Sequence, residues 1–214
     1  MNPATPTIPR ALQEKLDALD REIVLLHFKW IYLKQLFGTE KHLAVVNATA
    51  PSAFSVIKEA LFNEILLSLM RLVDPAGSKH QMNLSLRSLL EDIPDEKLRD
   101  QVAALEKQIR EKVTDIKTWR DKKLAHNDLL RLLKKSDPVP PIQIFELTAA
   151  MQLVRKAMNL IYQFFSQPHV LYDQCVTQKD GNDLIFYLNY GLECWREDRE
   201  KRNFDRARRL RSKT

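Results

Sequence analysis

A long heptad stripe near the N-terminus constrains the fold of this chain more than any other sequence feature. Its apolar residues alternate steps of four and three positions, which places them on one face of a single helix. The helix is predicted to begin after Pro9 and to end at Gly38. A helix of this length must pack along another long helix, from this chain or from a second copy. The stripe consists of Leu12, Leu16, Leu19, Ile23, Leu26, Trp30, Leu33 and Phe37.

Helical periodicity continues along most of the chain, and no alternation typical of β-strands is convincing. We therefore expect an all-α fold, an up-and-down helical bundle of about five main helices with short accessory helices, forming a homodimer. A short helix is expected over residues 40–47, and another, capped by Asn83, through Leu90. The remaining long helices are predicted from Pro51 to Asp74, from Pro94 through Trp119, over about 142–166, and from Asn182 or Asp183 into the C-terminal tail.

The composition excludes several classes of protein. Only four of the 214 residues are glycine, and the two cysteines, Cys175 and Cys194, cannot build a disulfide framework and match no metal-ligand spacing. We predict no metal and no cofactor, because HExxH, CxxC and glycine-rich phosphate loops are all absent. No apolar run is long enough to span a membrane, and the N-terminus lacks a signal-peptide pattern. A soluble, cytoplasmic protein without membrane contact is expected.

Most of the net charge of +6 lies at the C-terminus. Residues 196–214 hold nine Arg or Lys residues against four acidic ones, so the domain predicted over residues 8–195 is close to neutral. A basic helical tail over 196–214 can hold a polyanion such as RNA, with Arg206, Arg208 and Arg209 as candidate contacts. The competing interpretation is a solvated terminal helix whose charges have no partner.

Arg120 and His126 form the most informative cluster of polar residues. Arginine presents a planar fork of donors to a phosphate, and histidine transfers protons near neutral pH. At about 100° per residue, Arg120 falls on the apolar stripe of the helix after Pro94, where a charge is costly unless it is paired or lines a wet cleft. In the structural interpretation, Arg120 pairs with an acid and His126 caps a helix end.

The letters around this pair resemble the motif of the HEPN superfamily. In that family an arginine followed by a polar residue precedes a histidine, with four to six residues between the arginine and the histidine; here Asp121 is the polar residue and five residues intervene. Residues 70–75 and 83–86 look further like the abortive-infection (AbiU-like) branch. The likeness spans roughly residues 12–165, and it implies a HEPN-like domain within 8–195.

This resemblance implies a metal-independent endoribonuclease that works as a homodimer, in phage defence or as a toxin. Arg120 and His126 would be the catalytic residues, with the two copies facing each other across a shared cleft. Cleavage by the RNA 2′-hydroxyl needs both a base and an acid, which two histidines can supply. An antitoxin or regulatory protein is a further implied partner. Supporting roles are expected for Asp121, Asn127 and Asp128, and weak RNA contacts for Lys122 and Lys123.

Two other functions compete with the nuclease. A non-catalytic helical module would hold RNA or a partner protein through the basic tail and the grooves between helices. A structural dimer would use the heptad stripe alone. The other histidines carry no motif, and His27, between Leu26 and Phe28, is predicted to be a residue at the edge of the core.

Overall fold

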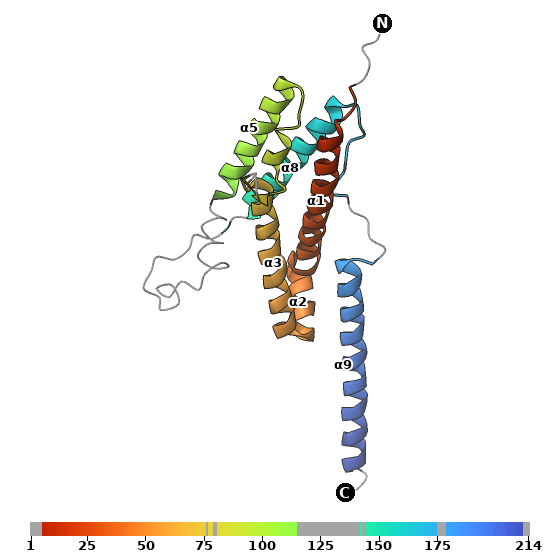
Figure 1. The fold of residues 1–214 in the computed structure, drawn as a ribbon. Coiled ribbons are helices and arrows are strands. Elements are labelled where there is room, and N and C mark those ends of the chain that lie inside the picture. Colours follow the sequence, from red (N-terminus) through yellow and green to blue (C-terminus); the bar gives the residue numbers. More distant parts are fainter. Residues whose placement is uncertain are drawn as a thin grey trace, which may run out of the picture. The chain divides into compact units, whose positions relative to one another are not determined.

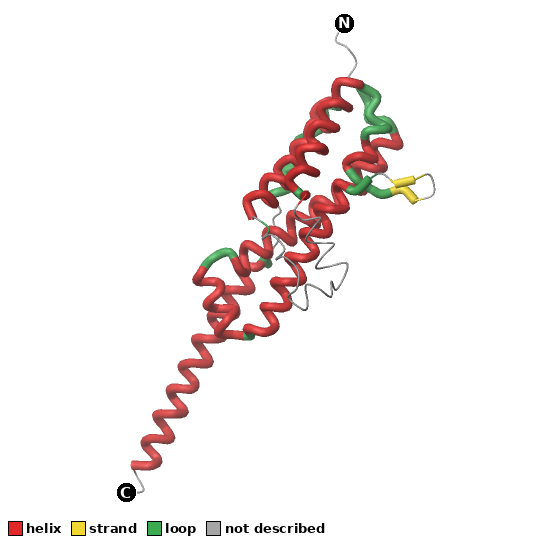
Figure 2. The backbone as a smooth tube through the Cα atoms, turned by 90° about the vertical axis from the view of Figure 1, so that its left-hand side faces the viewer, coloured by secondary structure: helices red, strands yellow, loops and turns green. Residues whose placement is uncertain are grey.

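The structure is a computed structural model that describes residues 6–75, 77–78, 81–114, 142, 144–174 and 179–211. Over these residues the fold is all-α, as predicted, apart from a small hairpin of two-residue strands (Figure 2). Strand β1 (Gly77–Ser78) pairs antiparallel with β2 (Gln81–Met82). The helices are α1 (Arg10–Phe37), α2 (Glu40–Thr49), α3 (Pro51–Val73), α4 (Leu86–Leu89), α5 (Glu96–Lys112), α8 (Ile144–Phe164) and α9 (Gly181–Arg211).

Local signals set the boundary between α1 and α2. The Gly38 N–H donates to the Lys34 carbonyl, 2.8 Å away, and a Cβ at Gly38 would lie 2.3 Å from that oxygen. Only glycine fits there without a shift of the backbone. Thr39 then caps α2, because its hydroxyl accepts a hydrogen bond from the His42 N–H at 3.1 Å. The predicted end of the first helix is therefore correct.

The predicted cap at Asn83 is wrong. Helix α4 begins at Leu86 with Ser85 as its N-cap, and the Ser85 N–H donates to the Ser88 hydroxyl at 3.2 Å. The side chain of Asn83 is used elsewhere, because its Nδ2 donates to the Pro75 carbonyl at 3.0 Å. The amide that could have capped a helix instead ties this segment to the end of α3.

The chain divides into two compact units. The first contains the described parts of Met1–Phe28 and Asn63–Cys175, and the second those of Lys29–Phe62 and Val176–Thr214. Helices α1 and α3 contribute residues to both units.

The core of the first unit is built from α1, α3, α5 and α8. Helices α5 and α8 pack against each other (Figure 1), and the first five residues of the predicted α1 stripe are fully buried. Two tyrosine hydroxyls, of Tyr162 on α8 and Tyr172 in the loop after it, donate to the carboxylate of Asp20 on α1. This buried polar cluster fixes α1, α8 and the loop in one arrangement.

The second unit has a smaller core of its own. Leu33 and Phe37, predicted to continue the buried stripe, are only partly buried, and Leu36 is buried instead because this core lies on another side of α1. Gln35 joins α1 to the start of α9, since its Oε1 accepts from the Gly181 N–H at 3.0 Å and its Nε2 donates to Asp180 at 2.6 Å. The buried residues of this core are Leu36, Val45, Val46, Phe54 and Ile185.

Candidate functional site

The predicted catalytic cluster lies outside the described residues. On its N-terminal side the description ends at Thr114, six positions before Arg120, and helix α8 begins at Ile144 on the other side. The described residues nearest to the cluster in sequence are the end of α5 and the start of α8. The cluster consists of Arg120, Asp121, Lys122, Lys123, His126, Asn127 and Asp128.

The C-terminal end of α3 borders two cavities in the first unit. We name the first, of about 330 Å³, the Arg71 cavity. Arg71, on the wall of this cavity, forms an ion pair with Glu64, two turns earlier on α3, with Nη1 and Oε1 3.3 Å apart. Both side chains are largely exposed, so the pair contributes little stability. The residues that line the cavity are Glu22, Ser68, Arg71, Leu72, Asp74, Asn83 and Leu84.

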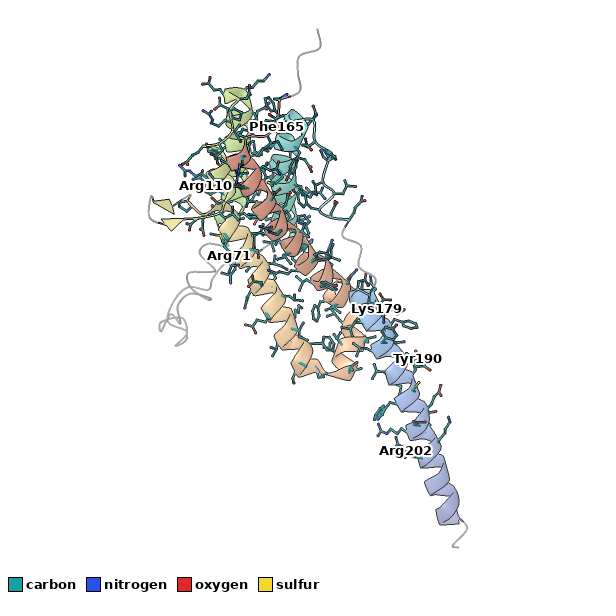
Figure 3. The ribbon with its side chains drawn as sticks, turned by 45° about the vertical axis from the view of Figure 1, so that its right-hand side comes forward. Arg71, Arg110, Phe165, Lys179, Tyr190 and Arg202 are labelled. Carbon is teal, nitrogen blue, oxygen red and sulfur yellow. The ribbon has the colours of Figure 1, made fainter. Side chains whose placement is uncertain are left out.

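The second cavity, the Arg110 cavity, has a volume of about 350 Å³ and lies between the ends of α3 and α5. Figure 3 labels Arg71 on α3 and Arg110 on α5. Asp74 borders both cavities. Thr114, the last described residue before the predicted cluster, lines the Arg110 cavity. It is lined by Met70, Val73, Asp74, Pro75, Arg87, Arg110, Val113 and Thr114.

A buried carboxylate orients Arg110. Arg110 Nη2 donates to Glu106 Oε2 at 3.0 Å, and the side chain of Glu106 is 5% exposed whereas that of Arg110 is 49% exposed. The second oxygen, Glu106 Oε1, is buried and has no hydrogen-bond partner within the described part of the chain. Arg110 thus has one edge held by Glu106, while Arg87 adds a second guanidinium to the cavity wall. The cavity thus brings together two guanidinium groups, with the carboxylate of Asp74 on its wall and that of Glu106 bonded to Arg110.

The structure joins the two stretches that carried the resemblance to the abortive-infection branch. Residues 70–75 form the end of α3, and residues 83–86 lead into α4. The hydrogen bond from Asn83 to Pro75 brings them together, and both contribute to the wall of the Arg71 cavity. Asp74 directly follows the end of α3, in agreement with the helix predicted from Pro51 to Asp74.

A third cavity in the first unit, of about 410 Å³, lies between α8 and the loop after it. His169 lines it but is exposed. Arg155, also on its wall, forms an ion pair with Asp173, whose hydrogen bond from Arg155 holds the Asp173 pKa below its usual value despite some desolvation. Unlike the Arg110 cavity, this one does not border Thr114, the last described residue before the predicted cluster.

Among the described residues, the other histidines and acids give no sign of a metal centre. His27 is buried, with Nδ1 2.9 Å from the Ile23 carbonyl and its ring against that of Tyr172, so it belongs to the core as predicted. In the described ranges, no group of three or more His, Cys, Asp or Glu side chains could hold a metal ion.

In the described part of the chain, no helix is both long and apolar enough to cross a membrane.

Comparison with known families decides the identity of this fold. A family model described as AbiU2 (HEPN_AbiU2) matches residues 10–175. The chain belongs to the AbiU2 family of HEPN proteins. No curated protein and no solved structure matches it.

The AbiU2 match covers most of the chain and begins where α1 begins. It includes both cavities at the end of α3 and, in sequence, the run from Arg120 to His126. It ends before α9, which therefore lies beyond the part that defines the family. The chain is a HEPN-type module of the abortive-infection kind, and the predicted family is confirmed.

Sequence reasoning missed Glu106 and Arg110. The signal was present, because Glu106 falls at the edge of the apolar stripe of α5, and an arginine follows it four positions later. An acid on a buried edge needs a nearby cation, and Arg110 is that cation. What the sequence could not indicate is that Arg110 faces the end of α3.

Proposed function

We propose that this chain is a metal-independent endoribonuclease of the HEPN type that acts in abortive infection or as a toxin. The observation that carries the proposal is the AbiU2 match, which spans the Arg120–His126 motif. RNA would be cleaved at a composite site in which two copies of the motif face each other across a homodimer interface. An antitoxin or other regulatory protein would control it.

The chemistry follows from what the two side chains can do. The RNA 2′-hydroxyl loses its proton to one histidine and attacks the adjacent phosphorus, and the bond to the 5′-oxygen breaks. The leaving oxygen takes a proton from the second histidine, so the products are a 2′,3′-cyclic phosphate and a 5′-hydroxyl. A single His126 cannot serve as base and acid in one step, whereas two copies can. Arg120 would hold the non-bridging phosphate oxygens in bidentate fashion.

The neighbouring polar residues would support this pair. Asp121 would orient Arg120, and Asn127 or Asp128 would fix the tautomer of His126 through a hydrogen bond to its other ring nitrogen. Lys122 and Lys123 would add positive charge for the RNA backbone.

The Arg110 cavity is a candidate place for the RNA beside the catalytic residues. Thr114 lines the cavity, and the six-residue step from Thr114 to Arg120 spans at most about 20 Å of extended chain. Arg87 and Arg110 give the cavity wall two guanidinium groups. We infer that this cavity receives the RNA backbone beside the scissile phosphate, with Glu106 holding Arg110 in place.

The test uses purified full-length protein with RNA as substrate. Wild-type protein is expected to cleave, and Arg120→Ala and His126→Ala to lose cleavage at least about a hundredfold, since general acid–base catalysis contributes on that scale. His169→Ala is the matched control, because His169 is exposed and outside the motif. Undiminished cleavage by His126→Ala, free of contaminating nuclease, would overturn the proposal.

A non-catalytic RNA-binding module is the second candidate, and one observation favours it. Residues 196–214, which begin within α9, carry nine Arg or Lys against four acidic residues, and they lie outside the family match. This function predicts RNA binding that weakens steeply with salt and no cleavage by wild-type protein. The cleavage assay therefore separates the two candidates.

A further inference from the structure

An aromatic groove in the second unit lies between the end of α2 and the outer face of α9. It encloses a hollow of about 410 Å³. Tyr187 and Trp195, both on α9, are 56% and 53% exposed, so large aromatic surfaces are left in water. The groove is lined by Ala48, Thr49, Tyr187, Leu188, Gly191, Leu192 and Trp195.

The spacing of residues along α9 leaves a gap within the groove, between Tyr187 and Trp195, which we call the slot. Tyr187, Gly191 and Trp195 are four positions apart, so they lie one above another on the same face of the helix. The two aromatic residues are about 12 Å apart along the helix axis. The glycine between them contributes no side chain, and a Cβ built at Gly191 would meet nothing within 4 Å.

The glycine is costly for the helix. Glycine inside a helix destabilises it by about 1 kcal/mol relative to alanine. Neither a steric clash nor a backbone angle requires Gly191, since space for a side chain is open there. This gap, which lies between two exposed aromatic residues, leaves room for a flat group.

An arginine stripe continues from the groove along the same face of α9. With Trp195 as zero and about 100° per residue, four arginines fall within about 40° of it, whereas the four acidic residues that follow fall about 60° or more away. Arg208, predicted from charge alone to contact RNA, falls about 140° away and is not part of this face. The stripe consists of Arg199, Arg202, Arg206 and Arg209.

The first two arginines of the stripe are accessible. The Arg199 guanidinium carbon lies 5.3 Å from the centre of the Trp195 ring, and Arg202 Nε donates to the Asp198 carbonyl at 3.2 Å. Neither forms an ion pair with an acidic side chain of the described residues. All residues from Glu193 to Asn203 are exposed, and Figure 3 labels Arg202 on this part of the helix, beyond Tyr190.

We propose that this groove and stripe bind single-stranded RNA, with an unpaired base in the slot against Tyr187 and Trp195 and the phosphates on the arginines. Stacking on aromatic rings and charge along the backbone are the two terms that hold single-stranded nucleic acid. A base paired in a duplex could not enter the slot. The inference rests on the proposed function, because it names the element that holds the RNA for the Arg120/His126 site.

The groove is tested by filling it. Full-length His126→Ala protein is used, because it is expected to bind RNA without cleaving it. Its affinity for a fluorescein-labelled single-stranded RNA of about 12 nucleotides is measured by anisotropy. Gly191→Leu is expected to weaken binding about tenfold or more, because stacking in the slot is lost. Gly191→Ala is the matched control and should bind like the parent. Both substitutions favour the helix, so melting temperatures should not fall.

The stripe is tested with two triple variants of equal charge. Arg199→Ala/Arg202→Ala/Arg206→Ala removes three charges from the stripe, and its slope of log affinity against log salt should be shallower by about 2. The control triple removes three charges from other faces of α9 and should change the slope by less than about 0.7. The control variant is Arg196→Ala/Lys201→Ala/Arg211→Ala.

The outcomes separate this inference from the proposed function. Unchanged RNA affinity in Gly191→Leu, or equal changes of the salt slope in the two triple variants, would overturn RNA binding by the groove and stripe. The nuclease proposal would not be affected. Groove variants that break a homodimer while RNA affinity is unchanged would assign this face to a second copy and also overturn it. If the wild-type protein fails to cleave RNA while the groove variants lose affinity, the proposed function falls and the groove stands.

Discussion

The hydroxyl of Tyr172 donates a hydrogen bond to the carboxylate of Asp20, 152 positions earlier in the chain. The bond ties the loop after α8 to α1, and Tyr162 on α8 donates to the other oxygen of the same carboxylate. Both tyrosines are buried. The cluster therefore anchors the frame from which α5 and α8 lead toward the predicted catalytic segment.

The first prediction concerns the stability of this cluster. Tyr172→Phe should lower the free energy of unfolding by about 2 kcal/mol, because a hydrogen bond to a charged group is lost and one carboxylate oxygen stays buried. Urea unfolding measures the change. Tyr190→Phe is the control, because Tyr190 is exposed and outside the core. Equal stability of Tyr172→Phe and wild type would show that the cluster does not hold the loop.

The second prediction concerns alkaline pH. Burial, and then the hydrogen bonds to Asp20, raise the pKa of Tyr162 and Tyr172 well above the ordinary tyrosine value of 10.0. The folded state therefore keeps these hydroxyls protonated where the unfolded state loses its protons. The stabilisation is complete below about pH 10 and is lost progressively as the pH rises above it.

Melting temperatures between pH 8 and pH 11 measure this effect. The wild-type melting temperature should fall steeply above pH 10, and that of Tyr162→Phe/Tyr172→Phe, although lower at pH 8, should fall less. Parallel curves for the two proteins would contradict the assignment of the alkaline loss to this pair.

The third prediction concerns Glu106 and Arg110 at the Arg110 cavity. Arg110→Ala should cost about 1 to 2 kcal/mol, because it leaves the buried Glu106 carboxylate without its cation; the figure is modest because Arg110 is half exposed. Glu106→Leu should cost little, since Glu106 Oε1 already has no hydrogen-bond partner in the described structure. A double-mutant cycle by urea unfolding checks the pair, and an identical cost of Arg110→Ala in both backgrounds would refute the coupling.

Several helix boundaries could be predicted from the sequence because local residues determine them. Pro9, Gly38 and Pro51 act within one turn, so α1 and the start of α3 fall where they were expected. The hydrogen bond from Asn83 to Pro75 depends on distant packing, so no local pattern indicated it. Glu106 did have a local signal, its place at the edge of the apolar stripe of α5, but the part of the fold that Arg110 faces depends on packing. The two-residue strands are too short to carry a pattern.

The candidate site, too, could be predicted from the sequence only in part. The family could be predicted from the short run around Arg120 and His126, and the match over residues 10–175 confirms it. The roles of these residues stay predictions, because they lie outside the described residues. The aromatic groove on α9 could not be predicted, because it needs the end of α2 beside Gly191.

The fourth prediction concerns the composite site. If each active site needs His126 from two copies, a dimer with one His126→Ala subunit is inactive. In a fully exchanged equimolar mixture about a quarter of the dimers are wild type, so activity should fall to about a quarter of that of an equal total amount of wild-type protein. Cleavage rates of refolded mixtures measure this fraction. Activity near one half would mean that each copy works alone.

The central claim, that this AbiU2-family chain cleaves RNA by 2′-hydroxyl attack without a metal, is tested most directly by the ends of the products. Purified wild-type protein and His126→Ala are incubated with RNA in excess EDTA, and the product termini are identified by mass spectrometry. We predict 2′,3′-cyclic phosphate and 5′-hydroxyl ends from wild-type protein and none from His126→Ala. Intact RNA from wild-type protein, or the same ends from both proteins, would contradict the claim.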